Sequence, residues 1–153
     1  MDRRRAQGRR GVGGDPGGPR LTEADEALIS GDLDAAERAY KKILSDAPSD
    51  AAAEAGLAHV SLARRVSGAD PAAALAAAEK APDDVPAQLL AADIEVLSGL
   101  AEQAYARLVE LVRRTAGDDR EAARQHLVSL FTIAGPDDPA VASARRALSR
   151  ALF

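Results

Sequence analysis

The clearest hydrophobic pattern lies at the C-terminal end of the chain, in the stretch DDPAVASARRALSRALF. Val141, Ala144, Leu148 and Leu152 follow one another at helical spacing, and the arginines between them lie mostly off this line. The pattern predicts an amphipathic helix with one face to bury. Apolar side chains at a fraying terminus need a cover, so we expect the protein's own core, a partner, or both to cover this helix.

Similar patterns and punctuation predict helices along the chain from residue 22 onward. Asp70-Pro71 and Asp138-Pro139 each combine a capping aspartate with a proline at the first helical position. Asp118 with Glu121 has the spacing of a capping box. We therefore predict an all-α fold with eight helices, at about residues 22–30, 34–46, 51–66, 71–81, 85–98, 100–115, 119–134 and 139–152.

The chain also contains an internal repeat. Several residue types recur with a step of 34 positions: Ala24, Ala58 and Ala92; Leu28, Leu62 and Val96; Asp50, Asp84 and Asp118. Others recur at twice that step: Ser30-Gly31 with Ser98-Gly99, and Ala36 and Tyr40 with Ala104 and Leu108. A fixed period of this length is typical of stacked helical hairpins.

The period and its residues resemble the tetratricopeptide repeat, a helix–turn–helix unit. That family has a small residue where two antiparallel helices cross, and Ala24, Ala58 and Ala92 occupy this position. In the second helix a small residue precedes a bulky one by four positions, as Ala36 precedes Tyr40 in the segment GDLDAAERAYKKILSDAPSD. The resemblance implies a solenoid of helical hairpins over residues 21–153.

Two features depart from the family pattern. The large aromatic residue early in each first helix is replaced by Arg20, Glu54 and Gln88. The middle unit turns late, at Ser67-Gly68, and its second helix restarts at residue 70, so we interpret it as a degenerate repeat.

Composition narrows the possible chemistry. Hydrophobic residues make up 46% of the chain and aromatic residues only 3%, which predicts a core of Ala, Leu and Val. Cysteine is missing from the sequence, which excludes disulfides, thiolate metal sites and thiol redox chemistry and fits a cytoplasmic protein. No apolar run approaches the ~20 residues that span a bilayer, so we predict no membrane partner.

Charge is unevenly distributed. The formal net charge is −4, yet residues 1–20 carry six arginines against two aspartates, which leaves the remainder at −8. We predict that residues 1–20 are a disordered Gly/Arg-rich tail. An acidic body argues against nucleic acid as a partner of the folded domain. Salt-dependent binding of nucleic acid by the tail stays open as an alternative.

Candidate catalytic chemistry is sparse. The two histidines, His59 and His126, are far apart in sequence, and each is expected to be a packed or solvated side chain, although His59 has a position that can face a groove. Asp83-Asp84 and Asp137-Asp138 are expected to cap helices and not to bind a cation. We therefore predict no catalytic site, no cofactor and no metal site.

Stacked helical repeats leave a groove lined by the first helix of each unit, which suits peptides or protein segments. One version of the family grips acidic chaperone tails with Lys, Asn and Arg at fixed positions. The corresponding positions here hold Leu21, Asp25, Ala55, His59, Pro86 and Leu90, so that clamp is not expected.

The C-terminal half has a narrower resemblance. The elements LVELVRR, DREAARQHLVSLF and GPDDP, followed by a last helix ending RALF, are similar to the C-terminal region of the bacterial chaperedoxins, co-chaperones of the YbbN/CnoX type. In that family a thioredoxin-like domain comes first, and this sequence has no counterpart of it. The chain is therefore expected to be either a repeat-only relative or the product of a truncated gene.

The resemblance implies a co-chaperone that holds unfolded clients and docks on the GroEL-type chaperonin through its last helix. Carried over to this sequence, the helix would contact its partner through Arg145, Arg146, Leu148, Arg150, Leu152 and Phe153. We expect the helix to cap the solenoid while its tip, Leu152 and Phe153, is displayed. The alternative is a generic scaffold for another protein complex.

Overall fold

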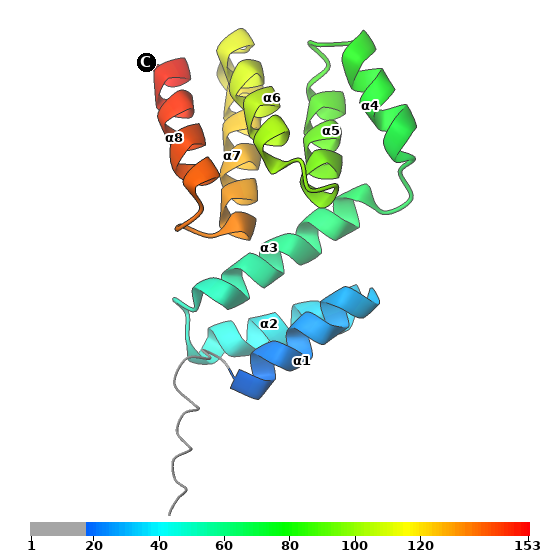
Figure 1. Cartoon of the computed structure of the whole chain (residues 1–153), viewed down its shortest axis with the longest axis vertical. Coiled ribbons are helices and arrows are strands. Elements are labelled where there is room, and N and C mark those ends of the chain that lie inside the picture. Colours follow the sequence, from blue (N-terminus) through cyan, green and yellow to red (C-terminus); the bar gives the residue numbers. More distant parts are fainter. Residues whose placement is uncertain (1–17) are drawn as a thin grey trace, which may run out of the picture. The chain divides into compact units, whose positions relative to one another are not determined.

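The structure is a computed structural model that describes residues 18–153, and the regular elements in this range are eight α-helices (Figure 1). They are α1 (Gly18–Ser30), α2 (Leu33–Asp46), α3 (Ala51–Val66), α4 (Pro71–Lys80), α5 (Val85–Leu97), α6 (Ala101–Arg114), α7 (Gly117–Ala134) and α8 (Pro139–Leu152). The predicted all-α fold and its eight helices are confirmed. Most of the predicted tail lies outside the described residues, but residues 18–20 belong to α1, where Arg20 pairs with Asp46 at 2.9 Å.

Aspartate caps begin five of the helices. Each aspartate accepts a hydrogen bond from a backbone N–H two or three residues further on, at 2.8–3.2 Å; they are Asp32, Asp50, Asp70, Asp84 and Asp138. The caps expected at residues 70, 84 and 138 are thus confirmed. The capping box expected at Asp118 is wrong, because α7 already begins at Gly117 and no side chain caps it.

The repeated Ser-Gly turns share one backbone conformation. Gly31 and Gly99 follow the first helix of their pairs with φ of 88° and 81°, and Gly68 after α3 has φ of 81°. This left-handed region is open to glycine at no steric cost. The repeated Ser-Gly pairs therefore mark a turn that ends a helix in the same way each time.

The chain divides into two compact units between Val60 and Ser61, inside α3. The single domain predicted over 21–153 stays a prediction. In the first unit α1 and α2 pack against each other around Ala24 and Ala36, both fully buried. Buried around them are Tyr40, Ile43, Ala53 and Val60.

Tyr40 is the largest side chain of this first core. Its ring is fully buried, and its hydroxyl donates a hydrogen bond to Asp25. Burial, with the Asp25 carboxylate beside it, raises the pKa of Tyr40. Gly56 of α3 lies directly against the ring, because a Cβ at this position would overlap ring carbons. The bulky residue predicted to follow Ala36 therefore fills the space beside a bare backbone.

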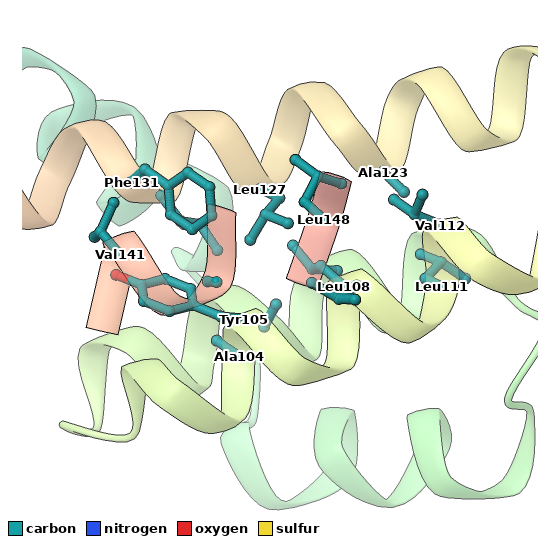
Figure 2. Close-up of a cluster of buried hydrophobic side chains, with 14 of the residues drawn as sticks. Ala104, Tyr105, Leu108, Leu111, Val112, Ala123, Leu127, Phe131, Val141 and Leu148 are labelled. Carbon is teal, nitrogen blue, oxygen red and sulfur yellow. The ribbon is translucent and has the colours of Figure 1, made fainter. Parts of the chain in front are cut away.

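In the second unit α6 is the central helix, in contact with α5, α7 and α8. Ala92 of α5 and Ala104 of α6 are fully buried, as is Leu108, which repeats the arrangement of the first pair. Ala58, the middle member of the alanine series, is only half-buried. The core between α6, α7 and α8 is closed by Tyr105 and Phe131, whose rings meet edge to face at 5.1 Å (Figure 2).

A polar network occupies the position of the missing aromatic residue in α5. Gln88 is buried and donates to the carbonyls of Ala78 and Ala81, at the end of α4, at 2.8 and 3.1 Å. Arg107 of α6 donates to Gln88 at 2.7 Å and makes two bonds of 3.0 Å to Glu95. Hydrogen bonds here join α4, α5 and α6, where the family uses aromatic packing.

The contact between Gly56 and Tyr40 predicts the effect of Gly56→Ala. Alanine favours a helix over glycine by about 1 kcal/mol. Overpacking a buried site costs about 1–3 kcal/mol, and the enclosed Tyr40 ring cannot move aside. We expect a net loss of stability, measured as a lower midpoint in urea denaturation followed by circular dichroism.

The control is the double variant with Tyr40→Leu, whose smaller side chain makes room for the new methyl group. Its destabilisation should be clearly less than the sum of the two single effects. A Gly56→Ala protein at least as stable as the wild type would contradict the close contact.

Candidate functional site

Helix α8 has two opposite faces. Val141, Ala144 and Leu148 are buried in the core of the second unit. Arg146, Arg150 and Phe153 follow at spacings of four and three residues, so they share one stripe on the other side of the helix. The two arginines are exposed, as is the whole Phe153 side chain. We call these three residues the α8 stripe.

The other predicted partner residues are engaged by the protein itself. Leu148 is only 8% exposed and belongs to the core, and its role as a partner anchor stays a prediction. Leu152 is half-buried and packs against the same core, so only Phe153 of the predicted tip is displayed. The Arg145 guanidinium lies 4.9 Å from the centre of the Phe131 ring, a cation–π contact.

A second feature centres on a buried carboxylate, Asp93 of α5. Arg65, near the end of α3, donates to it through Nε and Nη2 at 2.9 and 3.0 Å. His126 Nε2 of α7 lies 2.7 Å from the same carboxylate. Burial by itself raises the pKa of Asp93, but the hydrogen bonds from His126 and Arg65 outweigh it and hold the pKa below its usual value.

Arg65, Asp93 and His126 line a groove of about 370 Å³. The other lining residues are Pro86, Leu89 and Leu90 of α5, all partly or fully exposed. Two of the positions named above for the acidic-tail clamp, 86 and 90, therefore do line a groove, but with apolar side chains. We call this feature the α5 groove.

The histidine predictions have different outcomes. His126 is packed, as expected, but its partner is a buried carboxylate. His59 is half-buried.

Among residues 18–153, no three potential ligand side chains gather in a way that would hold a metal ion. No helix in this part of the chain is long and apolar enough to cross a membrane.

Sequence reasoning missed the buried polar residues of α5. The signal was present, since Gln88, Asp93 and Glu95 interrupt a helix whose other residues are nearly all apolar, VPAQLLAADIEVL. Charged side chains are almost never fully buried unless they are paired. Their presence on such a helix calls for basic partners on neighbouring helices, although the sequence does not say which.

The fold places the chain among helical-hairpin repeat proteins, and comparison with known proteins agrees. The tetratricopeptide-repeat family model matches residues 64–153, and the chain belongs to this family. Its repeats generally serve as protein-interaction modules, and they bind protein partners.

Curated relatives come from mycobacteria. The chain is 36% identical over 135 residues to the uncharacterized protein Mb1359 of Mycobacterium bovis, and equally to MT1366 and Rv1324 of Mycobacterium tuberculosis. The match covers 88% of this chain but 44% of the length of each relative. No solved structure matches the chain.

The lowered pKa of Asp93 predicts a pH-dependent effect of Asp93→Asn. A carboxyl with a lowered folded-state pKa adds stability above its unfolded pKa of about 4, and this is lost as the pH falls through the folded value. Leaving a hydrogen-bonded buried group without its partner costs about 1–3 kcal/mol, and the Arg65 charge left behind is 34% exposed and so partly solvated. We expect a loss of this order at pH 7, shrinking below pH ~4, in urea denaturation at several pH values.

The matched control is Asp137→Asn, at an exposed aspartate in the turn before α8. Asp137→Asn should change the free energy of unfolding little at neutral pH and at acid pH. An Asp93→Asn effect that is equally large at neutral and acid pH would contradict an electrostatic role for the carboxylate.

Proposed function

We propose that this protein is a non-catalytic co-chaperone in the bacterial cytoplasm that holds client proteins and docks on the GroEL-type chaperonin through α8. The family supports an interaction module. The chaperonin is suggested by the resemblance of the C-terminal half to chaperedoxins. Because the chain spans less than half of its mycobacterial relatives, activities of a longer protein lie outside this proposal.

The α8 stripe is the observation that carries the proposal. The buried face of α8 holds the helix on the core, so the opposite face is presented in a fixed register. Among the described residues, neither Arg146 nor Arg150 has an ion-pair partner, whereas many other arginines of the second unit are paired. Two cations beside an exposed aromatic ring suit a partner surface that is acidic and apolar.

Arg145 and Leu148 are not part of the proposed interface. Arg145 lies beside the buried face, on Phe131, and Leu148 is within the core. Substituting either residue would disturb the fold together with any interface, so neither serves as a test. Leu152 is half-buried and stays at the margin of the interface.

The experiment measures binding of the purified chain to purified GroEL-type chaperonin by biolayer interferometry. Arg146→Glu with Arg150→Glu should weaken binding at least tenfold, because both charges of the stripe are reversed. Phe153→Ser should weaken it through loss of the apolar contact. The matched control reverses two exposed cations elsewhere, Arg38→Glu with Lys80→Glu, and should bind as the wild type does.

A wild-type chain that fails to bind chaperonin would contradict the proposal. The alternative is a generic scaffold for another complex, which keeps the interaction role and drops the chaperonin. Capture of partners from a bacterial lysate separates the two, since chaperonin dominates the bound fraction in the first case only.

A further inference from the structure

We infer that this chain forms a symmetric dimer in which α8 of each copy packs into a groove between α6 and α8 of the other, with Arg150 of one copy against Glu102 of the other. The inference concerns self-association. It does not depend on the chaperonin, although the dimer uses part of the α8 stripe.

The groove between α6 and α8 has a volume of about 380 Å³. Small side chains line both of its walls, which are formed by Ala106 of α6 and by Ala140, Ser143, Ala144 and Ala147 of α8. Helices approach each other most closely where their side chains are small, so a groove of this kind suits another helix. The polar groups around the groove indicate which helix.

One polar group of the groove has no hydrogen-bond partner in the described part of the chain. Tyr105 lines the groove and is only 3% exposed, and among residues 18–153 no group forms a hydrogen bond with its hydroxyl. Figure 2 shows the hydroxyl end of the ring on the side of Val141, near the beginning of α8. Buried polar groups are nearly always hydrogen-bonded, so this hydroxyl calls for a partner from outside the chain.

Negative charge gathers at this end of the groove. Glu102 lines it, is exposed and has no ion-pair partner among the described residues. Burial, and then the charge of the nearby Asp138, raises the pKa of Tyr105. The other acidic residue of the lining, Glu110, already pairs with Arg113 at 2.6 Å. The complementary group is therefore a cation, and a guanidinium can donate to a carboxylate and to a hydroxyl oxygen together.

The chain carries such a cation on the same surface. Arg150 is exposed and has no ion-pair partner in the part of the chain that the structure describes. It follows Ser143 and Ala147 by seven and three positions, so it shares their side of α8. A surface that holds both a groove and the group complementary to it can meet a second copy across a two-fold axis, the commonest arrangement of homodimers.

The register of the helices allows this pairing. Short turns connect α6 to α7 and α7 to α8, so α6 and α8 run in the same direction (Figure 1), and Glu102 lies at the end of the groove where α8 begins. We place the two-fold axis midway between Ser143 and Ala147, with the two copies of α8 antiparallel. Arg150 and Ala140 are each five positions from that midpoint, so Arg150 of one copy lies opposite Ala140 of the other. Arg150 then reaches the acidic end of the groove.

The test measures the mass of the purified full chain by sedimentation equilibrium over a range of concentrations. The monomer has a mass of 15.9 kDa, and the wild type should approach twice this value as the concentration rises. Glu102→Arg and Arg150→Glu should each weaken dimerisation at least tenfold, because like charges then face each other in both contacts. An equimolar mixture of the two variants should dimerise as the wild type does, because opposite charges meet again in both contacts of the mixed dimer.

Two further variants separate the groove from the fold. Tyr105→Phe should weaken the dimer three- to tenfold and leave the urea denaturation midpoint of the monomer unchanged, since the hydroxyl has no hydrogen-bond partner among residues 18–153. The control, Glu26→Arg, reverses the charge of an exposed glutamate of α1 outside the groove lining. Its dimerisation should equal that of the wild type.

A wild type that stays monomeric at every concentration would overturn the inference and would leave the groove to water or to another protein. A dimer that survives both single charge reversals, or a mixture that stays monomeric, would also overturn it.

The chaperonin measurement separates this inference from the proposed function. Glu102→Arg leaves the α8 stripe unchanged and should bind chaperonin at least as well as the wild type, because no dimer then covers Arg150. A chain that dimerises as described but does not bind chaperonin would contradict the proposed function alone.

Discussion

Neighbouring helices of each unit pack closely because alanines lie buried between them. Ala24 with Ala36, and Ala92 with Ala104, are fully buried where consecutive helices pack against each other. A larger side chain at such a crossing would push the helices apart, and the space beside them would then be unfilled. Tyr40 and Leu108 occupy that space one turn later. Small and large residues therefore work as pairs, and the repeat of the pairs produces the repeat of the fold.

Buried polar groups add specificity to a core poor in aromatic residues. A core of Ala, Leu and Val offers few distinctive shapes, so helices can slide relative to one another at little cost. Gln88, Asp93 and Glu95 all lie on α5, and each requires a particular partner on a neighbouring helix. An unpaired buried charge is strongly destabilising, so these partners select one register for the helices around α5.

On the two candidate surfaces, contacts within the protein hold exposed groups in place. On α8 one face anchors the helix, and the stripe of Arg146, Arg150 and Phe153 is left for a partner. On α5 the same carboxylate that joins three helices also orients Arg65 at the edge of a groove. In both places a structural contact fixes the geometry of an exposed group, which limits the entropy lost on binding.

The helices, most of their caps and the repeat could be predicted from the amino-acid sequence. These features depend on local chemistry, such as Asp138 before Pro139 or Gly99 after Ser98, and on spacings that can be counted. It also predicted the buried stripe of α8. It missed the start of α1 and misjudged the cap of α7, since helix ends depend on small energy differences within a few residues.

Which polar residues meet depends on the packing of the helices. Asp93 is 28 positions from Arg65 and 33 from His126, and no local pattern links them. Arg145 is a second case. It is the same residue type as its neighbour Arg146, but only the structure shows that its side chain packs on Phe131. A difference of one residue rotates a side chain by about 100° around a helix, so its role depends on the neighbour that lies in that direction.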